Sequence, residues 1–237
     1  MSSTPPPRTR PVIAIDGPAG AGKSTVAAHL ARQFGLLNLE TGAMYRALAL
    51  KAIQNDADLD SEAELMALAA ETRIVLEPQL EGNRVVLDGF PVSHRVREPD
   101  VTAAASRVSV HPRVRHWMVE QQRALGSRGG VVMEGRDIGT VVFPDAEVKL
   151  FLDAAPEVRG NRRYRQGEPK AAHETEAAVL QELKERDARD RTRAESPLRP
   201  AEDATVLDTT GMSLDEVLHA VEALVHHAVG ESRVHES

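Results

Sequence analysis

The chain has 237 residues, of which 41% are hydrophobic and 27% charged, with a formal net charge of −7 at pH 7. This size and composition fit one soluble α/β domain with room for a smaller insertion. The negative charge argues against a general nucleic-acid or membrane-surface binder, because such proteins need a positive excess to meet phosphate groups. Without cysteine there is no disulfide or thiolate chemistry, and no apolar run reaches the roughly 18 residues of a membrane helix. We expect a cytoplasmic monomer that binds neither nucleic acid nor membrane.

A glycine-rich loop near the start of the chain carries the first functional signal. After a predicted disordered tail over 1–11, an apolar strand over Val12–Ile15 leads into Gly17-Pro18-Ala19-Gly20-Ala21-Gly22-Lys23-Ser24-Thr25, with a helix predicted over Ser24–Phe34. This order of strand, loop and helix is the context that a phosphate-binding loop requires. Its N–H groups can surround phosphates, Lys23 can reach the β- and γ-phosphates, and the Ser24 hydroxyl can ligate Mg²⁺. The loop predicts that the protein binds a nucleoside triphosphate.

Polar residues also follow the second predicted strand, over 36–39. The segment Glu40-Thr41-Gly42-Ala43-Met44-Tyr45-Arg46 leads into a helix that continues to Ile53. Thr41 lies where a helix cap belongs, and capping alone would explain it. Arg46 lies about one turn inside the helix and points back toward the helix N-terminus.

Residues 60–100 interrupt the alternation of strands and helices. Ser61 and Glu64 make a capping-box start to a helix that ends near Ala70. The runs 73–76 and 84–87 predict an antiparallel hairpin, followed by a turn at Asp88-Gly89 into Phe90-Pro91-Val92. We therefore predict an inserted subdomain over 60–100 within a core that spans 12–59 and 101–229.

The second half of the chain returns to the α/β pattern. Helices from Pro99 and Pro112 carry Ser106 and Arg115, and strands are predicted over 131–133, 149–152 and 205–207. The first of these strands ends at Glu134-Gly135-Arg136-Asp137. The next predicted helix, from Pro156, is rich in arginine and is broken at 167–169. The remaining predicted elements are a helix over 173–193, a last helix over 214–229 and a frayed tail over 230–237.

Ligands of open parallel sheets collect at the carboxyl ends of the strands, and the polar residues named above lie at such ends. Arg186, Asp190 and Arg193 share one face of a predicted helix, at i, i+4 and i+7. A solvated salt-bridge ladder would explain them, but in a protein that handles phosphates we favour a functional role. Phosphoryl transfer needs charge neutralised and oxygens placed in line, and arginine provides a planar fork of donors for phosphate. The residues alone predict a P-loop kinase of a small phosphorylated acceptor.

Four blocks of the sequence together resemble the bacterial cytidylate kinases: residues 17–24, 40–46, 134–146 and 184–193. The resemblance runs from about Val12 to Val225. It implies the fold of a P-loop nucleoside monophosphate kinase, with a five-stranded parallel sheet core and a short lid over about 156–169. The inserted small antiparallel β subdomain over 60–100 would lie on the acceptor side. It also implies transfer of the γ-phosphoryl group of ATP to CMP or dCMP with Mg²⁺.

The same resemblance implies roles for individual residues. The loop from Gly17 to Thr25 would bind the triphosphate, with Ser24 on the metal, and Ser106 and Asp137 would read cytosine. The implied catalytic residues are Lys23, Arg136, Arg186 and Arg193. The implied acceptor-binding residues are Thr41, Arg46, Ser106, Arg115, Arg136, Asp137, Arg186, Asp190 and Arg193. Glu40 stands where we would expect aspartate, and sequence does not rank the lid arginines Arg159, Arg162, Arg163 and Arg165.

Two alternatives remain open at this point. The acceptor of a P-loop kinase could be another molecule, such as UMP or a phosphorylated metabolite. A nucleotide-dependent switch could instead bind a partner through the insertion at 73–90, although a switch needs no arginine-lined acceptor pocket.

Overall fold

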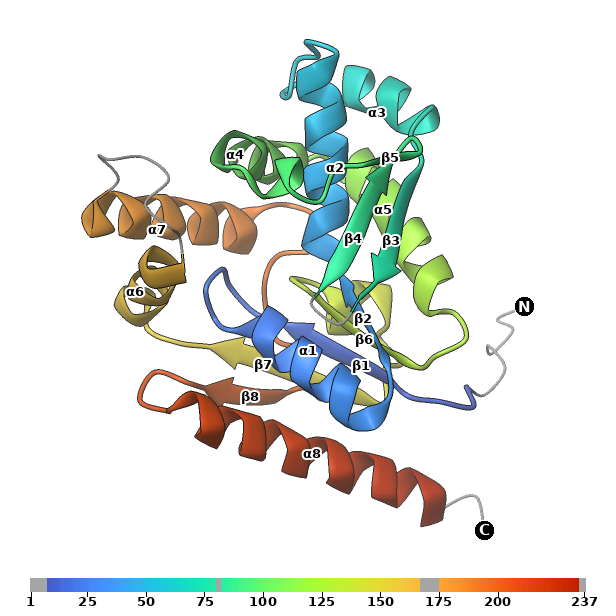
Figure 1. The fold of residues 1–237 in the computed structure, drawn as a ribbon, viewed down its shortest axis with the longest axis vertical. Helices are drawn as coiled ribbons and strands as arrows, with labels where there is room; N and C mark the ends of the chain where they lie inside the picture. The colour runs from blue at the N-terminus through green and yellow to red at the C-terminus, as the bar shows by residue number, and fades with distance from the viewer. Residues whose placement is uncertain (1–7, 80–81, 167–174, 235–237) are drawn as a thin grey trace.

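The computed structural model describes residues 8–79, 82–166 and 175–234 (Figure 1). Its centre is a sheet of five parallel strands in the order β2-β6-β1-β7-β8. The strands are β1 (Val12–Asp16), β2 (Leu37–Glu40), β6 (Val131–Gly135), β7 (Val148–Asp153) and β8 (Thr205–Asp208). The predicted α/β class and five-stranded parallel core are confirmed, and the strand that precedes the glycine-rich loop is central.

Helices cover both faces of this sheet. They are α1 (Lys23–Phe34), α2 (Thr41–Gln54), α4 (Pro99–Val108), α5 (Pro112–Gly126) and α8 (Leu214–Val234). Ile13 and Ile15 of β1 belong to one buried cluster with side chains of α1 and α8, whereas Val12 and Ala14 belong to another with α2, α4 and α5. Because successive side chains of a strand point to opposite faces, β1 must be apolar along almost its whole length.

A second, antiparallel sheet with the strand order β3-β4-β5 lies beside α2 (Figure 1). Its strands are β3 (Ile74–Pro78), β4 (Asn83–Leu87) and β5 (Phe90–Pro91), preceded by α3 (Glu62–Ala70) and followed by the short helix η1 (Arg95–Arg97). The predicted hairpin is confirmed. Leu76, Val85 and Leu87 pack into the same cluster as α2 and α4, so the inserted segment shares a hydrophobic core with the rest of the chain.

Three further elements complete the described structure: η2 (Ile138–Val142), α6 (Pro156–Gln166) and α7 (Glu176–Thr192). Helix α7 begins after Thr175, whose hydroxyl oxygen accepts a hydrogen bond from the backbone N–H of Ala178 at 3.2 Å. The predicted start of this helix at 173 and the predicted lid residues 167–169 lie outside the described residues. Within the described ranges, no helix has both the length and the apolar character needed to cross a membrane.

At both ends, the described structure reaches into the predicted tails. Arg8, before β1, donates a hydrogen bond to the Asp145 carboxylate at 2.8 Å. At the other end, α8 continues to Val234 and includes the first residues of the tail predicted over 230–237. The remainder of each predicted tail lies outside the described residues.

One side chain of the small sheet joins it to the central sheet. The amide oxygen of Asn83 accepts from the backbone N–H of Glu40 at 2.8 Å, and its amide nitrogen donates to the carbonyl of Asn38 at 2.7 Å. Asn83 is only 4% exposed. The amide thus supplies the partners that a neighbouring strand would give to the edge of β2, just before the chain enters α2.

We expect Asn83→Ala to lower the free energy of unfolding by about 2 kcal/mol, because it leaves a buried N–H and a buried carbonyl of β2 without partners. Urea unfolding followed by circular dichroism measures this loss. The control is Arg84→Ala, which removes an ion pair with Glu77 whose two side chains are about half exposed, and should cost less than about 0.5 kcal/mol. Equal, small losses in both variants would show that the Asn83 bridge does not hold the edge of β2.

Candidate active site

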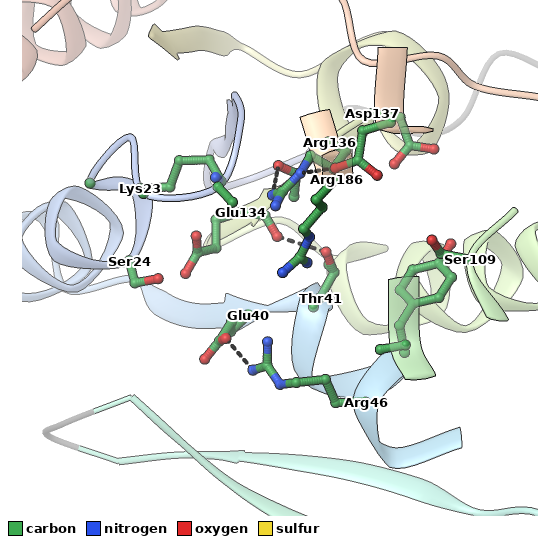
Figure 2. Close-up of a pocket in the computed structure, with 18 of the residues that line it drawn as sticks. Lys23, Ser24, Glu40, Thr41, Arg46, Ser109, Glu134, Arg136, Asp137 and Arg186 are labelled. Atoms are coloured by element: carbon green, nitrogen blue, oxygen red, sulfur yellow. Dashed lines mark hydrogen bonds and ion pairs between the residues drawn. The ribbon is translucent and has the colours of Figure 1, made fainter. Parts of the chain in front are cut away.

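A cavity of about 270 Å³ lies at the carboxyl edge of the central sheet. Its walls come from the loops after β1 and β6, the start of α2, and helices α4 to α7 (Figure 2). Among the described residues, the cationic side chains that line it are Lys23, Arg46, Arg115, Arg136, Arg162, Arg163, Arg186 and Arg193. The lining carboxylates are Glu40, Glu134, Asp137 and Asp190. A chain of net charge −7 therefore encloses a cavity with an excess of positive charge, which suits an anionic ligand.

The glycine-rich loop takes a backbone path that other residues cannot follow. Gly17 has a φ of +145°, and a Cβ at this position would lie 2.0 Å from the carbonyl oxygen of Leu152. Gly22 has a φ of +91° and caps α1 without a side chain, which leaves the first N–H groups of the helix free to face an anion. The Lys23 ammonium donates to the carbonyl of Pro18 at 2.7 Å and so lies folded over the loop. The predicted phosphate-binding loop thus has the geometry that its sequence requires.

Burial and neighbouring cations shape the charge of Lys23. Burial lowers the pKa of its ammonium to about 7, and the positive charge of Arg136 adds to this effect, while Glu134 opposes it. Burial also raises the pKa of the Glu134 carboxyl, and the nearby Glu40 raises it further. The Lys23 ammonium and the Glu134 carboxyl lie on the same side of the cavity (Figure 2). A polyphosphate placed here would restore the charge of Lys23 and relieve the repulsion from Arg136.

The residues around Ser24 fit a magnesium ion that is shared with a ligand. The Ser24 hydroxyl is exposed beside the Glu134 carboxylate, of which Oε1 is buried without a hydrogen-bond partner (Figure 2). Mg²⁺ prefers such oxygen ligands and is usually held by one or two protein groups together with waters and phosphates. Across the part of the chain that the structure describes, no cluster of three histidine, cysteine or acidic residues could hold a metal without such help.

Asp16, at the end of β1, is a residue that the sequence analysis missed. Its carboxylate accepts hydrogen bonds from the backbone N–H groups of Ile138 at 2.8 Å and Gly139 at 2.7 Å. Burial raises the pKa of Asp16 to about 6, although these two bonds oppose the shift. Asp16 therefore joins the phosphate loop to the turn after β6 and helps to fix the segment that carries Arg136 and Asp137. In the sequence, an acidic residue between an apolar strand and Gly17 was the signal that could have identified Asp16.

A buried ion pair closes the far side of the cavity. The Arg115 guanidinium of α5 pairs with Asp137 after β6, and the two side chains are only 3% and 6% exposed. The Arg115 guanidinium carbon lies 5.6 Å from the centroid of the Tyr45 ring. Burial raises the pKa of Tyr45 to about 12, and its hydroxyl has no hydrogen-bond partner. The predicted residues Arg115 and Asp137 thus lie together, with Tyr45 as a neighbour that sequence reasoning missed.

The predicted face of α7 points into the cavity. Asp190 accepts a hydrogen bond from Arg136 Nε at 2.9 Å, and its other oxygen lies 3.7 Å from Arg193 Nη1. Arg186 Nε and Arg193 Nη2 are buried without hydrogen-bond partners. Burial lowers the pKa of the Arg186 guanidinium to about 10, with a further contribution from the charge of Arg136. A solvated salt-bridge ladder is excluded here, because Asp190 and Arg193 are buried.

Thr41 and Arg46 lie where the second strand meets α2. The Thr41 hydroxyl donates to the carbonyl of Glu134 at 2.7 Å. The cap of α2 is Glu40 and makes no side-chain cap bond, so the expectation that capping explains Thr41 is wrong. Arg46 forms an ion pair with Glu40 at the edge of the cavity (Figure 2).

Ser106 is not among the residues that line the cavity, although its neighbours Ala105 and Ser109 are. Its hydroxyl oxygen accepts a hydrogen bond from Arg189 Nε at 3.1 Å. The role of Ser106 in reading a base therefore stays a prediction. Sequence reasoning missed Arg189 because this residue is one of several alternating charged residues of α7, and nothing in the pattern distinguishes it from them.

The structure separates the arginines of the predicted lid. Arg162 and Arg163 line the cavity, and Arg162 also donates to the hydroxyl and carbonyl oxygens of Thr209 at 3.0 and 2.8 Å. Arg159 and Arg165 do not line it. Arg159 is 2% exposed and makes all of its contacts inside the protein.

Comparison with known proteins places the chain in a family. The sequence profile described as cytidylate kinase matches residues 13–227. A cytidylate kinase of Aeromonas hydrophila is 47% identical over 225 residues, which cover 95% of this chain and 98% of the relative. A cytidylate kinase of Pelotomaculum thermopropionicum is 50% identical over 216 residues, which cover 91% and 96%. The Acinetobacter baumannii shikimate kinase, a solved structure, is 18% identical and covers 92% of this chain and 94% of its own, with a TM-score of 0.43. With these matches over almost its whole length, the chain belongs to the cytidylate kinase family.

Proposed function

We propose that this protein transfers the γ-phosphoryl group of ATP to CMP or dCMP in the presence of Mg²⁺, and that it forms ADP and CDP or dCDP. One observation carries the proposal: in a member of the cytidylate kinase family, a single positively charged cavity joins the phosphate loop to the buried Arg115–Asp137 pair. The end of the cavity at the phosphate loop suits a triphosphate. The end at the Arg115–Asp137 pair offers the fixed polar groups that a base needs.

At the triphosphate end, we assign the loop from Gly17 to Thr25 to the phosphates and Lys23 to the β- and γ-phosphate oxygens. Ser24 and Glu134 would hold Mg²⁺, which supplies charge neutralisation on the phosphates when bound. The free N–H groups at the start of α1 add their partial positive charge at the same place.

In the middle of the cavity, we assign Arg136, Arg186 and Arg193 to the acceptor phosphate and the transferring group. Transfer passes through a state whose charge is spread over the phosphoryl oxygens, so fixed guanidinium donors stabilise it more than the ground state. The unpaired Arg186 Nε and Arg193 Nη2 support this assignment, because their donors have no protein partner. Asp190 fixes the orientation of Arg136 through the bond to its Nε.

At the base end, we assign Asp137 to the exocyclic amino group of cytosine. The ion pair with Arg115 holds this carboxylate in place, and a carboxylate offers hydrogen-bond acceptors only. UMP presents an oxygen where CMP has its amino group, which leaves a buried acceptor unpaired and costs roughly 1–3 kcal/mol, or about 5- to 150-fold. We keep the role of Ser106 as a prediction, because its hydroxyl can still donate a hydrogen bond while it accepts one from Arg189, but it does not line the cavity in this structure.

We also propose that α6 is the base of a lid and that residues 60–100 form the acceptor-side part of the protein. Arg162 and Arg163 of α6 line the cavity, which supports their contact with phosphates when the site is filled. The Asn83 bridge to β2 supports a role of the small sheet in holding Glu40 and the start of α2.

The first expected outcome concerns the reaction. ADP release from ATP and Mg²⁺, followed with a coupled assay, should depend on CMP or dCMP and be slower with UMP by roughly 5- to 150-fold. Activity with a different monophosphate would preserve the mechanism but reject the role of Asp137. ADP release without any dependence on an acceptor would favour the nucleotide switch.

The second concerns base recognition. Asp137→Asn removes the charge of the carboxylate that accepts a hydrogen bond from the cytosine amino group. We expect this substitution to raise the KM for CMP by about 10-fold or more. The KM for ATP should change by less than about threefold, because Asp137 lies at the opposite end of the cavity from the phosphate loop. Equal changes in both constants, measured by initial rates, would exclude a specific acceptor contact.

The third concerns the charge of Lys23. With a pKa of about 7 in the free protein, Lys23 is mostly neutral at pH 8, and triphosphate binding should raise its pKa and take up a proton. Uptake should disappear below pH 6, where Lys23 is already charged. Calorimetry of a non-hydrolysable ATP analogue in two buffers of different ionisation enthalpy measures it. The same uptake in Lys23→Met would assign the proton to another group.

A further inference from the structure

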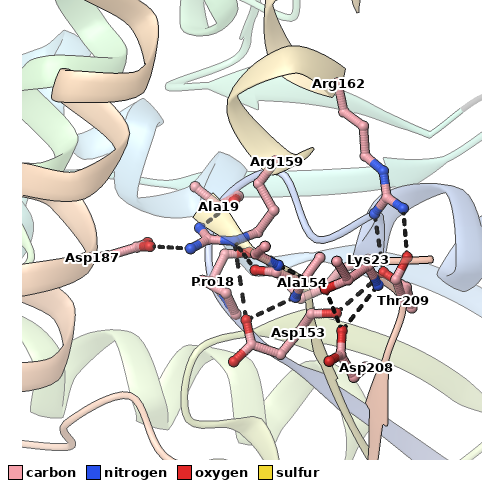
Figure 3. A network of polar contacts seen from close by, with 12 residues as sticks. Pro18, Ala19, Lys23, Asp153, Ala154, Arg159, Arg162, Asp187, Asp208 and Thr209 are labelled. Atoms are coloured by element: carbon pink, nitrogen blue, oxygen red, sulfur yellow. Dashed lines mark hydrogen bonds and ion pairs between the residues drawn. The ribbon is translucent and has the colours of Figure 1, made fainter. Parts of the chain in front are cut away.

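Arg159 of α6 forms a buried link between two parts of the site without lining the cavity. Its Nη1 donates to the carbonyl of Ala19 in the phosphate loop at 3.0 Å, and its Nε donates to the carbonyl of Ala154 at 2.7 Å (Figure 3). Its Nη2 lies 2.6 Å from Asp187 on α7. Each of its three nitrogens thus has a protein partner, on three different segments of the chain, and the side chain is too buried to reach the cavity.

The backbones around this link approach closely enough to transmit small movements. A Cβ on Gly20 would lie 2.9 Å from the carbonyl oxygen of Arg159, so the phosphate loop rests directly on the backbone of α6. A Cβ on Gly160 would lie 3.2 Å from the side chain of Leu180 on α7. The loop thus packs on the backbone of α6, and α6 packs closely on α7, so a displacement of the loop is transmitted through close contacts.

Helix α7 carries the other end of the link into the cavity. Asp187 directly follows Arg186, and Asp190 lies one turn further along, where it holds Arg136. One oxygen of Asp187 pairs with Arg159, while the other has no hydrogen-bond partner. Among the contacts of this stretch of α7, the ion pair of Asp187 with Arg159 is the one that connects it to the phosphate loop.

We propose that Arg159 and Asp187 are positioning residues that couple the phosphate loop to the acceptor side of the cavity. A triphosphate that orders the loop would, through Ala19 and Arg159, also order the stretch of α7 that presents Arg186 and Asp190. The acceptor then binds to a helix that is already ordered, so each substrate strengthens the binding of the other by the same factor. This coupling rests on the proposed function, because that function supplies the two binding sites, one for the triphosphate and one for the acceptor.

The coupling is tested with the Kd of a non-hydrolysable ATP analogue, measured with and without saturating CMP. We expect CMP to lower this Kd by about fivefold or more in the unmodified protein. Asp187→Asn is nearly isosteric but removes the charge, and should bring the ratio of the two Kd values close to one. Arg159→Lys keeps a charge but loses the planar fork that reaches three segments, and should behave in the same way.

A matched control uses a different ion pair between the same two helices. Lys184 of α7 lies 3.1 Å from Glu157 of α6, and both side chains are about half exposed. Lys184→Gln should leave the ratio unchanged. Absence of coupling in the unmodified protein, or full coupling in both Asp187→Asn and Arg159→Lys, would overturn the proposal, even if the variants were less stable to urea.

Hydrogen exchange provides a readout that does not depend on the acceptor. The ATP analogue alone should slow exchange of the α7 amides around Asp187 in the unmodified protein but not in Asp187→Asn. Exchange that slows equally in both proteins would overturn the link. Failure of the proposed function is distinguishable, because it would appear as absent CMP binding while α7 still responds to the analogue. In that case the acceptor identified by the ADP-release assay replaces CMP in the coupling measurement.

Discussion

Repulsion between like charges is the constraint on which the rest of the site depends. Burial lowers the pKa of Lys23 and of Arg186, and the charge of Arg136, which lies close to both groups, lowers the two pKa values further. Such an arrangement is unfavourable in the free protein unless it is held from outside. The fold supplies that restraint through the strand ends and through α7, so the cavity keeps a positive charge that an anionic substrate relieves.

Carboxylates supply much of this restraint, and each of them has a different partner. Asp16 accepts two backbone N–H groups of the turn after β6, Asp137 pairs with Arg115, and Asp190 holds Arg136. Asp187 neutralises Arg159 away from the cavity. None of these pairs needs to add net stability, because a buried ion pair often does not repay its desolvation. Their effect is to fix the direction in which each guanidinium points.

The sequence predicted the parts of the site that rest on local patterns. The phosphate loop follows from glycines between a strand and a helix, and the shared face of Arg186, Asp190 and Arg193 follows from helical spacing. Partners that are distant in sequence could not be predicted in this way. Asn83 reaches Glu40, and Arg159 reaches Ala19, only because the chain has already folded. The contact of Arg8 could not be predicted for the same reason, since its partner Asp145 lies far along the chain.

The number of arginines near a phosphate loop says little about how many of them can bind phosphate. What separates them is whether their N–H donors already have partners. Arg159 is deeply buried, but each of its three nitrogens already has a partner, which is a carbonyl for two of them and a carboxylate for the third. Arg186 and Arg193 each keep a buried nitrogen without a partner. Because an unpaired buried donor costs about 1–3 kcal/mol, its persistence in the folded protein is best explained by a ligand that completes it.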